Sequence, residues 1–220
     1  MKVGTDGMLL GAWADVHPSQ KTAVDIGTGS GLVALMLAQR HDSLRLNAVE
    51  LDPGAAGQAS ENFAKSPWSE RLNVHNSSIQ EYVAATTERV DLVVSAPPYF
   101  VDDLKTPNHE RNLARHTPSL PHETLMECAH QLMNDTGIFC FILPVDVGEA
   151  IARHALDRGL YLQRKTHVKT VPDKAPRRLL LQWGRVRTRF VEDTLVLEEG
   201  HPRRFTADYI ALTRDFHDYM

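Results

Sequence analysis

The chain has 220 residues, of which 42% are hydrophobic and 24% charged, and it carries a formal net charge of −4 at pH 7. This length and composition fit one globular domain with a sizeable core, which we expect to span residues 1–220. The sequence contains no apolar run of about eighteen residues and its start lacks the layout of a signal peptide, which argues against a membrane or secreted protein and predicts a cytoplasmic location.

Short apolar runs alternate with helix-forming stretches through the first two thirds of the chain. The run TAVDI (22–26) is rich in β-branched residues and leads through a glycine-rich turn into LVALMLAQR (32–40), which has helix-forming composition. Further strands are predicted at residues 44–50, 72–75, 90–95 and 138–144, and further helices at 53–65, 122–133 and 145–156. Repeated units of this kind predict an α/β fold with a doubly wound, mostly parallel sheet covered by helices on both faces.

The alternation of predicted strands and helices ends after Gly159. Residues 160–170 and 177–186 read as two strands joined by a proline-containing turn with no helix between them, so we expect an antiparallel C-terminal pair at the edge of the sheet. This pair brings the predicted sheet to seven strands. A final helix begins at Thr206, and a stripe at helical spacing along it is predicted to pack against the core rather than bind a partner. The stripe consists of Tyr209, Leu212, Phe216 and Tyr219.

The turn VDIGTGSG (24–31) places three glycines after the first predicted strand. Glycines there allow a tight turn and the close approach of a ligand, while the following helix directs N–H groups and the positive end of its dipole at a carboxylate or phosphate. The G-x-G-x-G spacing differs from that of dinucleotide enzymes, and Asp25 before it suits an ammonium group better than a pyrophosphate. Glu50, at the end of the second predicted strand, stands where an acid binds ribose hydroxyls. These residues suit a ligand with a ribose, an ammonium and a carboxylate. S-adenosylmethionine carries all three groups, and we predict it as the cofactor.

A second candidate site, SAPPYF (95–100), follows the fourth predicted strand. In doubly wound sheets, ligands bind beyond the carboxyl ends of the strands where the strand order reverses, so this segment and the glycine turn should open onto one crevice. The connection that follows, 101–120, consists of about twenty mostly polar residues and has the length of an active-site lid or a binding loop.

The segments DIGTGSG, VELD and SAPPY together resemble the amino-methyltransferases of the S-adenosylmethionine-dependent Rossmann superfamily, whose fourth-strand motif is Asn/Asp/Ser-Pro-Pro-aromatic. The resemblance extends to MKVGTDGMLLGAWADV at the start, ENFAKSPWSERLNVH in the middle and YIALTRDFHDYM at the end. These segments look like the bacterial tRNA(Val) (adenine-N6)-methyltransferase family, and the resemblance covers essentially the whole chain. It implies a class I methyltransferase fold and transfer of a methyl group from S-adenosylmethionine to the N6 amine of the adenosine just 3′ of the anticodon.

The resemblance assigns cofactor binding to the glycine turn, the end of the second strand, a segment near the start of the chain and the residues after the third strand. The implied set is Thr5, Asp6, Asp25, Gly27, Thr28, Gly29, Gly31, Glu50, Leu51, Ser78 and Ile79. Ser78 stands where an acid usually contacts the adenine amino group, so we expect a weaker contact there. The resembling enzymes have additional chain before KVGTDG, which suggests that the N-terminal segment is shortened here.

The implied reaction is a direct displacement in which the adenine N6 amine attacks the methyl group of a sulfonium. Because this amine is a poor nucleophile, the site must flip the base out, stack it and accept hydrogen bonds from the amine. Tyr99 supplies the stacking face, and Pro97 and Pro98 stiffen the loop so that a main-chain carbonyl points at the amine. The second acceptor is missing, because Ala96 occupies the position of the motif asparagine. We therefore expect normal cofactor binding with slow or absent methyl transfer.

The charge is unevenly distributed along the chain. Residues 153–189 contain eleven Lys or Arg against two Asp, a charge of +9, which leaves −13 on the other 183 residues. Such a stretch favours a polyanion partner, and with the motifs above we predict tRNA, positioned through its phosphates. The predicted substrate-binding residues are Phe100, Arg111, Arg115, Arg164, Lys165, Lys169, Lys174, Arg177 and Arg178.

The sequence leaves two alternative functions open. The Pro-Pro-aromatic motif also occurs in amino-methyltransferases that act on rRNA, DNA or protein glutamine, although the sequence shows no separate domain for recognising DNA or a protein. The other alternative is a catalytically silent RNA-binding protein that keeps the cofactor pocket. The two cysteines, Cys128 and Cys140, are predicted to be buried thiols, and we expect a monomer without a metal.

Overall fold

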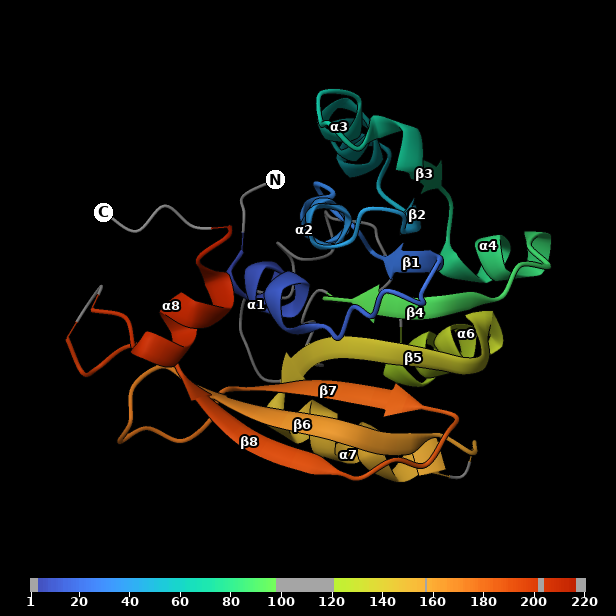
Figure 1. Cartoon of the computed structure of the whole chain (residues 1–220). Helices are drawn as coiled ribbons and strands as arrows, with labels where there is room; N and C mark the ends of the chain where they lie inside the picture. Colours follow the sequence, from blue (N-terminus) through green and yellow to red (C-terminus); the bar gives the residue numbers. More distant parts are fainter. Residues whose placement is uncertain (1–3, 98–120, 157, 202–203, 217–220) are drawn as a thin grey trace, which may run out of the picture.

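The computed structural model of the chain describes residues 4–97, 121–156, 158–201 and 204–216, and it contains one sheet with helices on both faces (Figure 1). The strands are β1 (Thr22–Ile26), β2 (Arg45–Glu50), β3 (Leu72–Asn76), β4 (Val90–Ser95), β5 (Met133–Pro144), β6 (Tyr161–Lys169), β7 (Arg178–Gly184) and β8 (Val191–Val196). The helices are α1 (Thr5–Trp13), α2 (Leu32–Arg40), α3 (Pro53–Ala64), the 3-10 helix η1 (Ser69–Arg71), α4 (Ile79–Ala85), α6 (His122–Leu132), α7 (Val145–Leu156) and α8 (Ala207–Thr213).

The strand order of the sheet is β3-β2-β1-β4-β5-β7-β6-β8. Strands β1 to β5 pair in parallel, and β7 runs antiparallel to both of its neighbours, β5 and β6. The predicted doubly wound, mostly parallel sheet with an antiparallel C-terminal pair is therefore confirmed. The order reverses at β1, which has β2 on one side and β4 on the other, and ligands of doubly wound folds bind beyond the carboxyl ends of such strands.

The prediction of seven strands was wrong, because an eighth strand, β8, pairs in parallel with the outer edge of β6. Most of β8 is exposed, and its sequence VEDTLV lacks the apolar alternation that marks a half-buried strand. Pairing with β6, rather than burial of its own side chains, therefore makes it a strand. As a result, neither member of the antiparallel pair forms the edge of the sheet: β7 lies between β5 and β6, and β8 covers β6.

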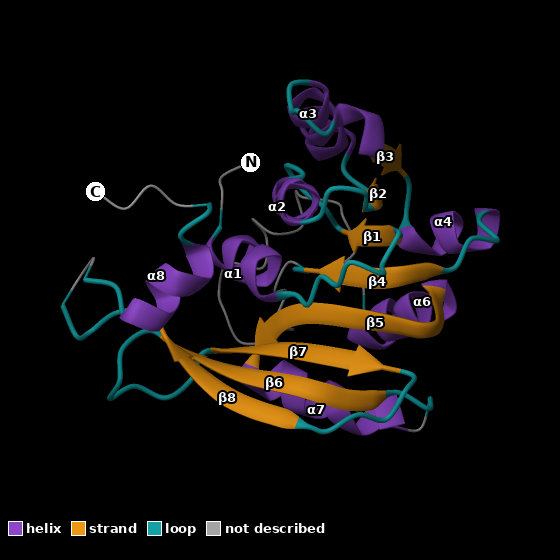
Figure 2. Ribbon diagram, viewed as in Figure 1, coloured by secondary structure: helices purple, strands orange, loops and turns teal. Residues whose placement is uncertain are grey.

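Two hydrophobic cores lie on opposite faces of the sheet. One contains residues of α1, α2, α3 and α8, such as Leu10 and Tyr209, together with strand residues such as Val94. The other contains residues of α4, α6 and α7, such as Leu125, together with Val93. The adjacent residues Val93 and Val94 belong to different cores because successive side chains of a strand point to opposite faces. Figure 2 shows the resulting layers, with α1 in front of the sheet and α6 and α7 behind it.

Helices α1 and α4 were not predicted from the sequence. Residues 9–13 of α1 are all buried, so the helix shows no polar face and no helical period. Helix α4 is only seven residues long and begins with a capping box. The final helix begins after Thr206 as predicted, with Tyr209 buried and Leu212 packed against the same core, which confirms that part of the stripe. Phe216 follows the end of α8 at Thr213, so it is not part of a helical stripe, and Tyr219 lies outside the described residues.

The two cysteines are free and buried, as predicted. Burial raises the pKa of the Cys140 thiol to about 12, which keeps the thiol protonated. No helix in the described ranges has the length and apolar content needed to cross a membrane.

Candidate cofactor and substrate site

The residues predicted for the site gather at the carboxyl ends of β1, β2 and β4. The glycine turn follows β1, Glu50 ends β2 and Ala96 follows β4. Strand β1 pairs with both of the others, so that Ile26 lies opposite Val49 of β2 and Ser95 of β4. The fold thus brings the glycine turn, the acid and the start of the fourth-strand motif to one edge of the sheet.

The glycine turn has a backbone that only glycine adopts readily. Gly27, Gly29 and Gly31 have φ angles of 69°, 59° and 84°, in the left-handed region that disfavours side chains. The N–H groups of Gly27 and Thr28 donate to the main-chain oxygen of Val49 at 2.8 and 3.2 Å. The turn is therefore tied to the end of β2, and α2 begins directly after it, so the N-terminus of this helix faces the same edge of the sheet.

Replacing Gly31 by alanine should lower the free energy of unfolding by about 2–5 kcal/mol. An added Cβ would stand 2.4 Å from Cε1 of Phe63, and the left-handed φ adds backbone strain. The matched control is Gly57→Ala in α3, where an added Cβ meets no atom within 4 Å and alanine should stabilise the helix by about 0.5–1 kcal/mol. Urea denaturation measures both variants, and equal midpoints would contradict the close packing of the turn against Phe63.

Glu50 joins the glycine turn to the start of α3. Its Oε2 accepts a hydrogen bond from the N–H of Gly29 at 2.8 Å, and its Oε1 accepts one from the N–H of Asp52 at 3.0 Å. The side-chain amide of Asn76, which the sequence did not single out, donates to the main-chain oxygens of Glu50 and Leu51 at 2.9 and 3.1 Å. The side chain of the next residue, Leu51, is exposed. An acid next to an exposed apolar side chain suits a ribose with its attached base.

Asp25 lies beneath the glycine turn and is only 1% exposed. Its Oδ2 accepts a hydrogen bond from Oγ1 of Thr28 at 2.6 Å, and the backbone of Ala34 in α2 supplies a second hydrogen bond. Burial, with a smaller contribution from the negative charge of Glu50, raises the pKa of Asp25 to about 7. The carboxyl group therefore holds the turn against α2, and its contact with an ammonium group stays a prediction.

Ser78 and Ile79 stand where the chain passes from β3 into α4. The Ser78 hydroxyl accepts a hydrogen bond from the N–H of Glu81 at 3.2 Å, and the N–H of Ser78 donates to Oε2 of Glu81 at 2.9 Å, which together form the capping box of α4. Ile79 is buried in the core shared with α6 and α7. Both residues stabilise the start of α4, and their contact with the cofactor stays a prediction.

The fourth-strand motif begins in the described part of the chain and continues beyond it. Ser95 is buried, and its Oγ donates to the main-chain oxygen of Ile26 at 2.9 Å, which ties β4 to β1 at the site. Ala96 is half-buried and packs against the first core, and Pro97 is buried. Five of the predicted residues lie outside the described residues: Pro98, Tyr99, Phe100, Arg111 and Arg115.

The basic residues of β6 form ion pairs with β8, the strand that the sequence did not predict. Nη2 of Arg164 lies 3.5 Å from Oδ2 of Asp193, and Nζ of Lys165 lies 3.1 Å from Oε1 of Glu192. The guanidinium of Arg164 also lies 4.5 Å from the ring centroid of Trp13. The positive charge that β6 can offer to RNA is therefore smaller than its count of basic residues implies.

The turn between β6 and β7 keeps two basic side chains at the surface. Lys174 and Arg177 are exposed, whereas Nζ of Lys169 donates to a main-chain oxygen within the turn. The turn stands at the carboxyl edge of the sheet, because β7 begins with Arg178 paired to Pro144 at the end of β5. Of the predicted cations in the described part of the chain, Lys174 and Arg177 are thus the two best placed to contact phosphates near the site.

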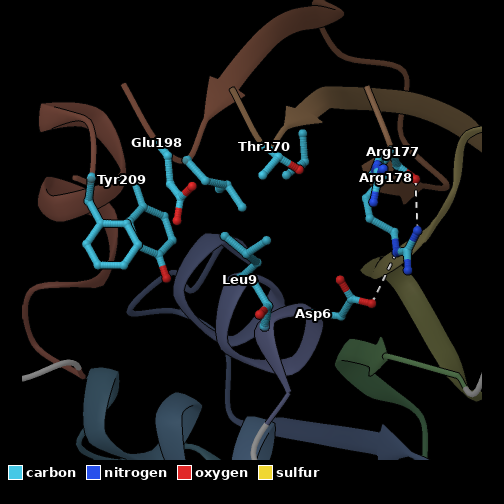
Figure 3. Close-up of a pocket in the computed structure, with 11 residues that line it drawn as sticks. Asp6, Leu9, Thr170, Arg177, Arg178, Glu198 and Tyr209 are labelled. Atoms are coloured by element: carbon cyan, nitrogen blue, oxygen red, sulfur yellow. Dashed lines mark hydrogen bonds and ion pairs between the residues drawn. The ribbon is translucent and has the colours of Figure 1, made fainter. Parts of the chain in front are cut away.

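Thr5 and Asp6 lie in the first turn of α1. Oδ2 of Asp6 forms an ion pair with Nε of Arg178 at 3.1 Å, so a residue predicted for the cofactor meets one predicted for RNA. Both α1 residues line a pocket between α1, the β6–β7 turn, the end of β8 and α8 (Figure 3). Over the ranges described, no three His, Cys, Asp or Glu side chains gather as a metal-binding group.

Comparison with known proteins agrees with this geometry. The methyltransferase small domain family matches residues 6–120 of the chain. A tRNA1(Val) (adenine(37)-N6)-methyltransferase of Escherichia coli O157:H7 is 44% identical over 221 residues, which cover 100% of this chain and 89% of that protein. The protein of the same name from Escherichia coli strain K12 / DH10B is 42% identical with the same coverage. These relatives confirm the resemblance seen in the sequence.

Solved structures share the fold at lower sequence identity. A predicted O-methyltransferase from Agrobacterium tumefaciens has a TM-score of 0.73 and 20% identity, with 98% of each chain covered. TrmN from Thermus thermophilus has a TM-score of 0.59 and 18% identity, covering 82% of this chain and 48% of its own. Because the family match spans more than half of the sequence and the tRNA1(Val) methyltransferases match it over its whole length, the chain belongs to the methyltransferase small domain family.

Proposed function

We propose that the chain transfers a methyl group from S-adenosylmethionine to the N6 amine of the adenosine next to the anticodon of tRNA(Val). The relatives that match the whole chain carry this activity in their names. The structural observation that supports it most is the hydrogen bond between Glu50 and the N–H of Gly29. This hydrogen bond holds Glu50, the acid expected to bind a ribose, against the glycine turn. Both lie at the edge of the sheet where β4 ends and its motif begins.

The residues of this edge fit S-adenosylmethionine. Glu50 accepts hydrogen bonds from the ribose hydroxyls, and Leu51 offers an apolar surface to the adenine. The glycine turn and the N-terminus of α2 face the carboxylate of the amino-acid end. The bound cofactor supplies an electrophilic methyl group on a positively charged sulfur. Asp25 accepts a hydrogen bond from Thr28 and so holds the turn in the conformation that makes these contacts.

The fourth-strand motif receives the adenine. The base has to leave its stack in the RNA and enter the site with its edge toward the methyl donor. Its amine then donates hydrogen bonds to acceptors in the site. Ala96 stands at the position where the motif of the resembling amino-methyltransferases has a polar residue, and its methyl group accepts no hydrogen bond. We therefore expect slow methyl transfer by this chain.

The RNA extends from this crevice along the carboxyl edge of the sheet toward the β6–β7 turn. Lys174 and Arg177 contact its phosphates there and set its position without reading its bases. Because such contacts release counterions, the affinity for tRNA falls as the salt concentration rises.

One observation favours a second candidate function. The alanine at position 96 is also what a catalytically silent RNA-binding protein with a cofactor pocket would carry. The names of the full-length relatives offer no support for rRNA, DNA or protein glutamine as the substrate.

We place the activity in the cytoplasm, with the tRNA, and treat residues 1–220 as one methyltransferase domain. The monomeric state stays a prediction.

Mass spectrometry of nucleosides tests the proposed function. A tRNA(Val) transcript is incubated with S-adenosylmethionine and either the parent chain or the Ala96→Asn variant, and then digested. N6-methyladenosine is expected, in larger amount with the variant. A transcript with guanosine in place of the target adenosine is the control and should yield none. If both chains bind the transcript and neither methylates it, the silent function is correct and the proposed one is wrong.

A further inference from the structure

A pocket of about 500 Å³ lies beside the candidate cofactor site, and although Thr5, Asp6, Arg177 and Arg178 of its lining were predicted individually as cofactor or RNA contacts, the pocket itself has no assigned ligand (Figure 3). Its volume falls within the range of about 300–1,000 Å³ typical of small-molecule sites. Four segments far apart in the sequence form it: the first turns of α1, the β6–β7 turn, the chain after β8, and α8. Its lining residues are Thr5, Asp6, Leu9, Val168, Thr170, Arg177, Arg178, Leu197, Glu198, Phe205 and Tyr209.

Helix α1 separates this pocket from the cofactor site. A Cβ built on Gly7 would lie 3.3 Å from Cδ2 of Leu32 and 3.7 Å from Cγ2 of Val33, so this side of α1 packs against the first turn of α2, directly after the glycine turn. The neighbouring residue, Asp6, pairs with Arg178 in the pocket at 3.1 Å. The two sites therefore share one helical turn as their common wall.

The pocket also stands at the same edge of the sheet as the cofactor site. Thr170 directly follows β6, Arg178 begins β7 and Leu197 directly follows β8. Strands β6 and β8 are parallel to each other, and β6 and β7 pair so that the start of β7 lies near the end of β6. All three residues therefore lie at the carboxyl edge, along which the RNA is proposed to run.

The lining combines an apolar wall with a hydroxyl group, the Asp6–Arg178 ion pair, the carboxylate of Glu198 and a surface cation. Leu9, Leu197 and Phe205 supply the apolar wall, Thr170 supplies a hydroxyl group, and Arg177 is exposed to solvent at the turn. A nucleobase has apolar faces and a polar edge, and the phosphate attached to its sugar is an anion. The lining therefore matches the parts of one nucleotide better than it matches a purely apolar or a purely ionic ligand.

We propose that this pocket binds a second nucleotide of the tRNA, a neighbour of the methylated adenosine in the anticodon loop. The inference rests on the proposed function. Proteins recognise single-stranded RNA loops by holding unstacked bases in pockets, and a loop whose adenosine has left the stack frees the bases beside it. The base lies against the apolar wall and its phosphate lies at Arg177. The pocket then reads the sequence next to the target, which phosphate contacts do not do.

Filling the pocket with a large side chain tests the proposal. Thr170→Trp is compared with Thr188→Trp, the same substitution at an exposed residue of the β7–β8 connection, which does not line the pocket. Fluorescence anisotropy measures the affinity of each variant for the anticodon stem-loop of tRNA(Val). Thr170→Trp should bind about tenfold more weakly than the parent chain, while Thr188→Trp binds like the parent. Calorimetry with S-adenosylmethionine should give the same affinity for all three chains, because α1 separates the two sites.

An RNA that lacks one base tests the pocket without filling it. The parent chain should bind about tenfold more weakly to a stem-loop that lacks the base at one position beside the target adenosine. Thr170→Trp should bind this abasic RNA as well as it binds the intact one.

The outcomes separate this inference from the proposed function. If the parent chain binds the stem-loop and Thr170→Trp binds it equally well, the pocket does not take a nucleotide and the inference is wrong, while the proposed function stands. Equal affinity of the parent chain for every abasic stem-loop contradicts the inference in the same way. If the parent chain has no affinity for tRNA(Val) or its stem-loop, the proposed function itself fails.

Discussion

Replacing Ala96 by asparagine is expected to raise the rate of methyl transfer to tRNA(Val) by about 100-fold to 1,000-fold, the usual effect of one preorganised polar group on a reaction of this kind. Position 96 directly follows β4, at the edge shared with Glu50 and the glycine turn. An asparagine oxygen there accepts a hydrogen bond from the amine, which localises the nitrogen lone pair for attack. Initial rates with radiolabelled S-adenosylmethionine measure the change.

The matched control for this prediction is Ala96→Leu. Leucine has nearly the shape of asparagine but no acceptor, so this variant should transfer methyl groups no faster than the parent chain. The affinity for S-adenosylmethionine should be unchanged in both variants, because Ala96 packs against the core and forms no part of the glycine turn. Equal rates for Ala96→Asn and the parent chain would show that position 96 does not supply the missing acceptor.

Asp25→Asn is expected to remove a pH dependence of stability that the parent chain shows between about pH 4 and pH 7. Burial raises the pKa of Asp25 from 3.8 to about 7. Between these two values the folded chain holds a proton that the unfolded chain has lost, so stability falls as the pH rises through this window and levels off above it. Asparagine is neutral at every pH and contributes no such slope.

The measurement is urea denaturation of both chains at pH 5 and pH 8. The difference in unfolding free energy, parent minus Asp25→Asn, should decrease by roughly 2–3 kcal/mol from pH 5 to pH 8. All other titrating groups occur in both chains and cancel in this difference. Asp42→Asn, at an exposed aspartate, is the control and should show the same pH dependence as the parent chain. A difference that stays constant with pH would mean that the Asp25 carboxyl group is ionised in the folded chain at pH 5.

Much of the fold could be predicted because its signals are local. The strand predicted at 22–26 and the one at 90–95 match β1 and β4 residue for residue, since buried parallel strands form short apolar runs. The glycines of the turn were recognisable because a left-handed backbone needs them, and Gly27, Gly29 and Gly31 do have positive φ angles. The placement of the turn and Glu50 at one edge then followed from the rules of doubly wound sheets.

Other features of the site could not be predicted, because they depend on contacts between distant segments. The acidic residues of β8 reduce the free charge of Arg164 and Lys165 on β6, and β8 itself has no apolar pattern of its own. The sequence places Asp25 in a ligand-binding motif without showing that its side chain is buried. The ion pair between Asp6 and Arg178 joins residues 172 positions apart.

By itself, the sequence determined the α/β class, the glycine turn with its acid at Glu50, and the methyltransferase family, because local backbone preferences and contiguous motifs carry that information. Only the tertiary structure decided which basic residues stay exposed, how Asp25 holds the turn from beneath, and that a pocket lies beside the cofactor site with one turn of α1 between them. The physical reason is that burial, ion pairing and the shape of a pocket depend on which distant surfaces the packed sheet brings together.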